Sequence, residues 1–467
     1  MEIFKKGISS FIFNALGSSI GFLLMFSAAR LLGTEEFGKF NYIFGYIGSF
    51  TLIFGLGASF FLPKHIPTNP NPINVLSATI SSSFVLLLIL FIPIIILFFD
   101  DSFSIVDYIL IFALTLVTVI IEHAKSYNIA INKADKAAKN YNLLIRLLSL
   151  FFFAGIIYFF TKSYLALIIS LLLSNLILAI PFISKHYKLV KPDITLLKGS
   201  LVFYSIQLTY SLFGYVSKIF QAKFNDFDVV ALLSVAILIG QIITLLGTNF
   251  ANVGMPIFSK SYSLGDNNNL RIKFQEIARI NAIIILPIFV FIFFNTEMIL
   301  TFFGDEYVKG DLILKLIIIG SFVNSIVGPN GTLLLMSGKE RLELYNGFLK
   351  LSIAIILTFI FGPKFIWGIA LAISVSDILV NFVKGLQVYK HFKILPFNKN
   401  DFLFLLVLGS LQIVFFYFLN VFTTNIYHIL IFSFIFLFVN YIISFSKSPN
   451  YEDRRLYLKI KNYLLNK

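Results

Sequence analysis

The sequence predicts an all-α, polytopic membrane protein with about 14 transmembrane helices. Hydrophobic residues make up 58% of the 467 residues, and they gather in apolar stretches of about 20 residues or more. Lysines and arginines fall mainly in alternate gaps between these stretches. Because a helix rises about 1.5 Å per residue, about 20 apolar residues cross the hydrocarbon core of a bilayer. Each stretch is therefore predicted to be one membrane-spanning helix.

The predicted helices follow one another along the whole chain. Pro93 and Pro287 fall inside predicted helices, and so does the run from Gly328 to Gly331. These residues predict kinks, because proline lacks a backbone donor and glycine tolerates unusual backbone angles. The predicted spans are 7–32, 37–61, 74–99, 105–128, 140–160, 164–184, 199–220, 229–253, 277–303, 311–336, 344–362, 366–388, 401–420 and 426–445.

The distribution of basic residues predicts the orientation. With Lys5 and Lys6 in the cytoplasm, 29 basic residues fall on the cytoplasmic side and 8 outside, which together are the 37 of the chain. The cytoplasmic set includes the segment from Lys339 to Lys350. Because basic residues are retained on the cytoplasmic side, we expect both termini in the cytoplasm and a multi-pass protein of the cell (inner) membrane. The net charge of +14 then reflects topology and contact with anionic membrane lipids, and no nucleic-acid partner is expected.

An internal repeat predicts how the helices are grouped. A shift of 193 residues superimposes residues of the same kind and keeps the spacing of two helices and their loop. Six spans separate the two copies, so we expect two six-helix lobes in the same orientation, related by a pseudo-two-fold axis along the membrane normal. The superimposed pairs are Lys198 with Lys5, Gln207 with Asn14, Ser211 with Ser18, Gly214 with Gly21 and Pro256 with Pro63. The predicted regions are an N-terminal lobe (1–190), a C-terminal lobe (191–395), two extra C-terminal helices (396–446) and a basic cytoplasmic tail (447–467).

Polar residues mark one face of the helix predicted at 199–220. They follow intervals of three and four residues, which is the spacing of one helix face. Polar side chains at membrane depth are costly unless they meet a partner or water, so this face is predicted to line a hydrated cleft between two bundles. The next helix repeats the pattern, and the first helix does so weakly. The residues are Ser200, Tyr204, Gln207, Ser211, Gly214, Lys218 and Gln221, then Ser234, Gln241, Thr248 and Asn252, and finally Asn14, Ser18 and Gly21.

Lys218 is the cation of this polar face, and two interpretations of it are open. Its long side chain can extend to the outer interface, as lysines near helix ends commonly do. Alternatively, its ammonium group can bind an anionic substrate group such as phosphate. In the second interpretation the accompanying substrate-binding candidates are Gln207, Ser211, Tyr204, Gln241, Asn252, Asn14 and Ser18.

Asp377 lies in the middle of the helix predicted at 366–388. A carboxylate at that depth is costly, so either it pairs with a basic group or it takes up a proton or sodium ion during a transport cycle. The second alternative makes Asp377 the ion-coupling candidate. Other charges have structural interpretations: Arg30 is expected to pair with Glu35 or Glu36, Glu122 to pair with Arg146, and Lys315 to extend to the outer interface.

Enzymatic chemistry is not expected. The chain has no cysteine, which excludes disulfides, thiol chemistry and thiolate metal sites. The predicted outer connections are too short for a catalytic domain, and the five histidines are scattered along the chain. No catalytic, metal-binding or cofactor-binding group of residues emerges, which argues against an enzyme such as a membrane glycan polymerase.

The run from Ala29 to Gly38, ARLLGTEEFG, follows a basic start and an apolar helix. It resembles the opening of Wzx-type polysaccharide and O-antigen flippases of the multidrug/oligosaccharidyl-lipid/polysaccharide superfamily. The resemblance implies a two-lobed bundle that moves undecaprenyl-pyrophosphate-linked oligosaccharide units, of O-antigen or capsule, from the cytoplasmic to the outer leaflet by alternating access. It also implies polysaccharide polymerase and export machinery as partners.

Two other transporters of that superfamily remain alternatives. Lipid II flippases typically carry additional arginines in the first helix, where this chain has Ser18 and Leu24, so the resemblance to them is weaker. A multidrug or organic-cation exporter is expected to place carboxylates in the first-lobe cavity. The first two predicted spans carry none apart from the boundary residues Glu35 and Glu36.

Overall fold

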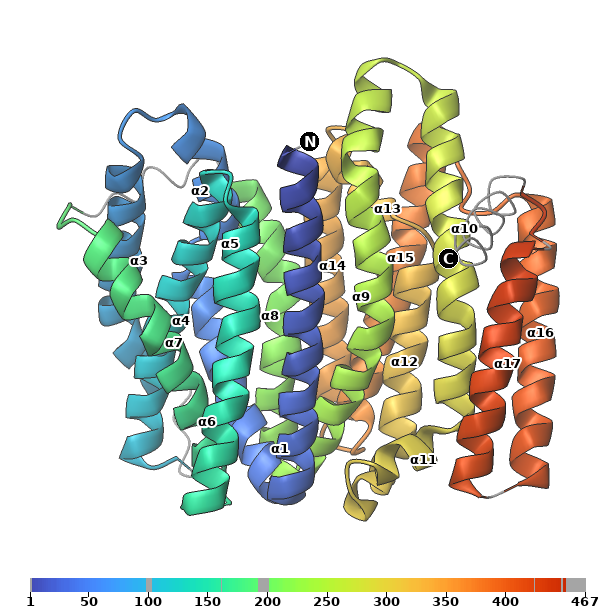
Figure 1. Cartoon of the computed structure of the whole chain (residues 1–467), viewed down its shortest axis with the longest axis horizontal. Coiled ribbons are helices and arrows are strands. Elements are labelled where there is room, and N and C mark those ends of the chain that lie inside the picture. The colour runs from blue at the N-terminus through green and yellow to red at the C-terminus, as the bar shows by residue number, and fades with distance from the viewer. Residues whose placement is uncertain are drawn as a thin grey trace. The chain divides into compact units, whose positions relative to one another are not determined.

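The computed structural model describes residues 2–97, 103–160, 162–191, 201–423, 425–446 and 448–450. Every regular element in these ranges is a helix, which confirms the predicted all-α membrane fold. The chain divides into two compact units, unit 1 (Met1–Ser234) and unit 2 (Val235–Lys467). Figure 1 shows that most of the long helices within each unit run side by side.

Unit 1 contains α1 to α8 and the first residues of α9. The elements are α1 (Glu2–Phe54), α2 (Ala58–His65), η1 (Ile66–Thr68), α3 (Pro72–Leu97), α4 (Ile105–Ala130), α5 (Ala134–Ala138), η2 (Lys139–Leu144), α6 (Ile145–Phe159), α7 (Tyr164–His186), α8 (Leu201–Phe224) and α9 (Phe227–Ser263). The unit extends past the boundary predicted at residue 190, because α8 packs against α1. The predicted lobe boundary and its symmetry axis stay predictions.

Unit 2 contains the rest of α9 and the helices that follow it. They are α10 (Asn267–Phe294), α11 (Thr296–Thr301), η4 (Asp305–Gly310), α12 (Asp311–Ile326), α13 (Asn330–Met336), α14 (Glu340–Phe361), α15 (Gly368–Phe392), α16 (Lys399–Phe422) and α17 (Ile426–Ser446). The break between α12 and α13 falls at the Gly328-Pro329 pair, where Gly328 has a φ of 87°. A kink was predicted at this position.

The first two predicted spans form one interrupted helix, α1. Gly33 has non-helical angles, φ 77° and ψ 177°, and Figure 1 shows the α1 ribbon turning near the label. The second span was predicted to reach residue 61, but α1 ends at Phe54. Leu56 and Gly57 both have positive φ, which a helix cannot accommodate, so α2 begins as a separate helix at Ala58.

The described residues contain 11 helices long and apolar enough to cross a membrane, or up to 12 if the bent pair α12 and α13 forms one span. This establishes a multi-pass membrane protein. The interrupted helix α1 counts once in this set, and α8, with its polar face, does not belong to it. If the bent pair counts as one span, α1 as two spans and α8 as one, the total is the predicted fourteen. That total stays a prediction.

The connected ends of α9 and α10 are longer than predicted. The predicted spans were 229–253 and 277–303, whereas α9 continues to Ser263 and α10 begins at Asn267. The Asp266 carboxylate accepts a hydrogen bond from the Asn269 amide at 3.0 Å and caps α10. In Figure 1 this hairpin projects beyond the neighbouring helices of unit 2, because polar segments next to a membrane can continue as helix in water.

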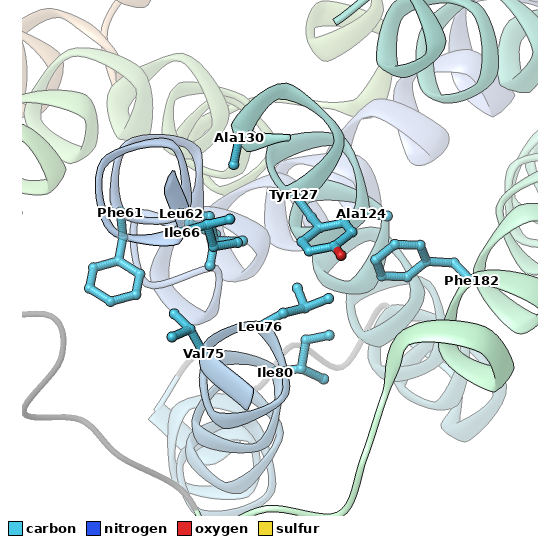
Figure 2. Packing of buried hydrophobic residues seen from close by; sticks show 11 residues of the cluster. Phe61, Leu62, Ile66, Val75, Leu76, Ile80, Ala124, Tyr127, Ala130 and Phe182 are labelled. Atoms are coloured by element: carbon cyan, nitrogen blue, oxygen red, sulfur yellow. The ribbon is translucent and has the colours of Figure 1, made fainter. Parts of the chain in front are cut away.

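The helices of unit 1 are held at one end by a hydrophobic cluster. Figure 2 shows its side chains gathered between α2, η1, α3, α4 and α7, with the Phe61 ring turned away from the others. Small residues let the helices approach closely, and the aromatic rings fill the remaining space. The labelled members are Phe61, Leu62, Ile66, Val75, Leu76, Ile80, Ala124, Tyr127, Ala130 and Phe182.

Candidate functional site

The C-terminal half of the polar face of α8 lies against the second half of α1. The Lys218 Nζ donates a hydrogen bond to the Asn41 Oδ1 at 2.7 Å, and it lies 5.7 Å from the centre of the Phe44 ring. Asn41 is buried, and its own amide nitrogen donates to the Phe37 carbonyl at 2.9 Å. The ammonium group is therefore held inside the helix contact by an amide oxygen and an aromatic face.

Two other candidates on α8 contact the break between α1 and α2, Tyr204 on the α1 side and Gln207 on the α2 side. The Tyr204 hydroxyl donates to the Ile53 carbonyl at 2.7 Å, and the Gln207 Oε1 accepts from the Ser59 hydroxyl at 3.2 Å. The last carbonyls of a helix lack partners within the helix, so Tyr204 caps α1 where it breaks. These two side chains thus have a structural use that the sequence analysis did not include.

The residues in the middle of the polar face of α8 have fewer neighbours. Ser211 is half-buried, Gly214 is exposed with open space beside it, and Ser200 lies outside the described residues. The Tyr215 ring, next to this face, packs on Gly48 so closely that a Cβ atom there would lie 2.1 Å from the Tyr215 Cδ1. Gly48 therefore sets the spacing between α1 and α8.

The first half of α1 meets η2 and α6. The Asn142 Nδ2 donates to the Asn14 Oδ1 at 2.9 Å, and a Cβ atom added to Gly17 would lie 2.9 Å from the Asn142 side chain. Ser18 is exposed. The two glycines of α1, Gly17 and Gly21, thus line a close contact, as small residues spaced by four often do.

Arg146 lies in this contact and not in the predicted pair with Glu122. A Cβ atom at Gly21 would lie 3.4 Å from the Arg146 Nε. The predicted pair is wrong, because Glu122 has its basic neighbour one turn along α4, where Lys125 lies 4.0 Å away. Among the described residues no carboxylate lies within 4.0 Å of Arg146.

Arg146 lies near the middle of an apolar helical stretch, Ala134–Phe159, twelve residues after Ala134. From the sequence, Arg146 was expected only as the structural partner of Glu122. Its position inside the predicted span 140–160 could have indicated a cation within the apolar part of that helix.

The candidates on α9 lie on an exposed face of unit 2. Gln241, Thr248 and Asn252 are exposed, and Thr248 donates to the Leu245 carbonyl on its own helix at 3.1 Å. Within the described part of the chain the Gln241 and Asn252 side chains make no hydrogen bond. Such side chains at membrane depth require water or a ligand.

Asp377 is paired. Its Oδ1 lies 2.6 Å from the Lys350 Nζ, and the two side chains are only 16% and 18% exposed. Lys350 follows the first residue of α14 by ten positions, and its assignment to the cytoplasmic side stays a prediction. The helix pattern extends further toward the N-terminus than the predicted start at residue 344.

Three further cations in the helices of unit 2 have acidic partners. The Lys384 Nζ lies 2.6 Å from the Glu343 Oε1, and the Arg279 Nη1 lies 3.3 Å from the Asp401 Oδ2. Lys315, predicted to extend to the interface, binds Asp311 on its own helix at 2.8 Å.

The end of unit 1 that contains Glu35 and the α8–α9 turn is acidic. Glu35 and Glu36, predicted to pair with Arg30, both bind Lys39, at 2.7 and 3.3 Å. A cavity of about 440 Å³ beside them is lined by Glu35, Tyr42, Ala222, Asn225, Asp226, Phe227 and Asp228. This lining repels anions, so the cavity is not a phosphate site. Throughout the described residues, no three His, Cys, Asp or Glu side chains lie together as metal ligands.

Comparison with protein families gives one match. A family model described as "Polysaccharide biosynthesis protein" matches residues 28–310. No curated protein matches the sequence.

Comparison with solved structures gives transporters. A lipid II flippase, MurJ, in an inward closed conformation is 18% identical, with a TM-score of 0.71 over 99% of this chain and 100% of that chain. A multidrug resistance MATE family transporter of the MOP superfamily is 16% identical, with a TM-score of 0.62 over 80% and 94%. A MOP superfamily transporter from Pyrococcus furiosus is 15% identical, with a TM-score of 0.55 over 83% and 96%. The fold is therefore that of MOP-type flippases and transporters.

Proposed function

Because the chain belongs to the polysaccharide biosynthesis protein family, we propose that it flips undecaprenyl-pyrophosphate-linked oligosaccharide units from the cytoplasmic to the outer leaflet. O-antigen and capsule units are the substrates in this proposal, and alternating access is the mechanism. The protein would lie in the cell (inner) membrane with both termini in the cytoplasm, and its partners would be the polysaccharide polymerase and export machinery.

The observation that carries the proposal is a difference in charge pairing. In the described residues of unit 1, Arg146 and Lys218 lie within helices and have no carboxylate within 4.0 Å. In unit 2, Lys350, Lys384 and Arg279 each have one. Unbalanced cations at membrane depth are costly unless an anion visits them. A pyrophosphate group supplies that anion, and a guanidinium group can bind two of its oxygens at once.

Polar side chains on α1, α8 and α9 suit the sugar part of the substrate. Asn14, Ser18 and Ser211 carry donors and acceptors on α1 and α8, and Gln241 and Asn252 carry them on α9. Tyr204 and Gln207 would act mainly by holding the break between α1 and α2, since Tyr204 binds the end of α1 and Gln207 binds Ser59 of α2. In this proposal hydroxyl and amide groups replace the water that sugar hydroxyls lose in the membrane.

The driving force follows from the charge of the substrate. Moving one elementary charge through 100 mV is worth about 2.3 kcal/mol, so an inside-negative potential favours outward movement of an anionic headgroup. Two cations at different positions, Arg146 in mid-span and Lys218 six residues before the end of α8, would hold the diphosphate at successive stages of that movement.

Lipid II is the second candidate substrate, favoured by the structural similarity to a lipid II flippase over the whole chain. Lipid II also carries a pyrophosphate, so the same two cations could serve it. The first half of α1 carries Ser18 and Leu24 where lipid II flippases typically carry arginines, and Arg146 of α6 lies against that helix instead. This difference ranks lipid II behind the glycan units.

The test is transport into the outer leaflet of proteoliposomes by the purified protein. Fluorescent undecaprenyl-pyrophosphate oligosaccharide is placed on one side, and its arrival on the other is read by an impermeant glycan-cleaving enzyme. Lipid II serves as the parallel substrate. Faster flipping of the oligosaccharide than of lipid II supports the proposal; the reverse order would replace it with the second candidate, and no flipping of either would overturn both.

A further inference from the structure

The Lys350–Asp377 pair belongs to a polar contact between α14 and α15. The helices are antiparallel, so partners run in opposite order: Lys350 with Asp377 at 2.6 Å, then Glu343 with Lys384 at 2.6 Å. Asn346 and Gln387 exchange two amide hydrogen bonds of 2.8 Å beside them. Lys350 and Asp377 both lie more than two turns from either end of their helices.

Polar side chains lie one turn on either side of Asp377 along α15, at Ser374 and Asn381. The Asn381 Nδ2 donates to the Asp377 carbonyl and to the Asn324 Oδ1, both at 2.9 Å. The neighbouring Ser374 hydroxyl donates to the Leu316 carbonyl. Helices α12 and α15 therefore gather amide, carbonyl and hydroxyl oxygens within about a turn of Asp377, which are ligands that hard cations prefer.

The charges facing Asp377 cancel locally. On α14, Lys350 is its direct partner, Glu343 binds Lys384, and Glu340 and Arg341 lie at the start of the helix. On α12, Lys315 binds Asp311 near the opposite end. The described helix α13 has no charged residue. Asp377 thus needs one positive charge, and Lys350 supplies it.

We propose that the Lys350 ammonium is a permanent counter-cation for Asp377, so that unit 2 binds neither sodium nor a proton there, and that removing Lys350 creates a monovalent-cation site. In the native protein the tethered ammonium occupies the position that a diffusible cation would need. Without it, the buried carboxylate must capture sodium, using the neighbouring oxygens, or become protonated. This inference concerns the cation and goes beyond the proposed lipid substrate.

The experiment measures cation binding without any lipid substrate. Thermal unfolding of the purified full chain is followed in sodium chloride and in choline chloride of equal ionic strength, from pH 5 to pH 8. The variants are Lys350→Met, Asp377→Asn and the double variant, and Lys364→Met removes an exposed lysine from the same hairpin as a control. For Lys350→Met we expect the midpoint to rise by about 2 °C or more between 1 and 100 mM sodium, or on acidification. The wild type, the control and the double variant should show neither response.

Two results would overturn the inference. One is a sodium-specific stabilisation of the wild type that disappears in Asp377→Asn, and the other is a folded Lys350→Met protein that responds to neither sodium nor pH. If Lys350→Met does not fold, radioactive sodium binding to the wild type and to Asp377→Asn decides: equal binding supports the inference, and a site lost in Asp377→Asn contradicts it. Because no glycan lipid is used, these outcomes are independent of the flipping assay.

Discussion

At the scale of single residues, Lys218 and Arg146 differ from the cations of unit 2 that have a carboxylate partner. Lys218 is held by the Asn41 amide oxygen and the Phe44 ring, and Arg146 lies over Gly21. Neither arrangement neutralises the charge, so both cations keep the ability to bind an anion. The sequence predicted Lys218 from its helical spacing. It could not predict Asn41, because which helices are neighbours is decided by packing between residues 177 positions apart.

Replacing Arg146 should weaken transport more than replacing an exposed lysine. Arg146→Ala removes a guanidinium group, and a hydrogen bond to a charged group contributes about 1.5–3 kcal/mol, so we expect flipping to slow by about 10-fold or more. Arg146→Lys should retain part of the rate, since it keeps the charge but not the paired donors. Lys223→Gln, at the exposed end of α8, is the control, and its rate should equal the wild-type rate. Equal rates for all variants would remove Arg146 from the site.

At the scale of elements, the breaks in helices are matched by specific side chains. Gly55 to Gly57 ends α1, and Tyr204 of α8 satisfies the carbonyl that the break exposes. Turn residues made the break between α12 and α13 predictable, but the end of α1 was placed seven residues too late because the following segment, α2, is also apolar and helical. Periodicity does not distinguish one long helix from two that meet at a turn.

Removing the Tyr204 hydroxyl should loosen this end of α1. Tyr204→Phe leaves the Ile53 carbonyl without its donor, which should cost about 1 kcal/mol of unfolding free energy and lower the thermal midpoint by about 2 °C. Tyr158→Phe, at a position 81% exposed on α6, removes the same group and should change little. A midpoint for Tyr204→Phe that matches the control would show that the cap is dispensable.

The ion pair between α14 and α15 should be more costly to break than to reverse. Asp377→Asn leaves the Lys350 ammonium buried without its partner, a change that typically costs about 3–5 kcal/mol. The exchange of the two residues, Lys350→Asp with Asp377→Lys, should recover part of that stability. Thermal unfolding of the single and double variants measures the difference. A double variant no more stable than Asp377→Asn would contradict a direct pair.

At the scale of the whole molecule, hydropathy and charge distribution predicted the fold class, because the bilayer imposes both. Contacts between particular helices were harder to predict from the sequence: the predicted Glu122–Arg146 pair is absent, and Lys350 was not predicted as the partner of Asp377. The polar face of α8 was predicted to line a hydrated cleft. Part of it instead binds α1, because a helix contact satisfies polar groups as well as water does.

Accessibility labelling can test hydration in each unit, since the native chain has no cysteine. Single cysteines at Ser18 in unit 1 and Gln241 in unit 2, both exposed, should react with a water-soluble maleimide in intact membranes. Phe434, 74% exposed on the apolar helix α17, should face lipid, and a cysteine there should react at least 10-fold more slowly, because thiolate forms poorly in hydrocarbon. Equal rates at the three positions would contradict a polar cleft.

The central claim is that the unbalanced cations of unit 1 bind the diphosphate of a lipid carrier. Native mass spectrometry of the purified protein with undecaprenyl pyrophosphate and with undecaprenol measures it directly. The account predicts that the wild type retains the diphosphate at least 10-fold better than the alcohol, and that the Arg146→Ala/Lys218→Ala double variant loses this preference. The same preference in the wild type and the double variant would contradict the claim.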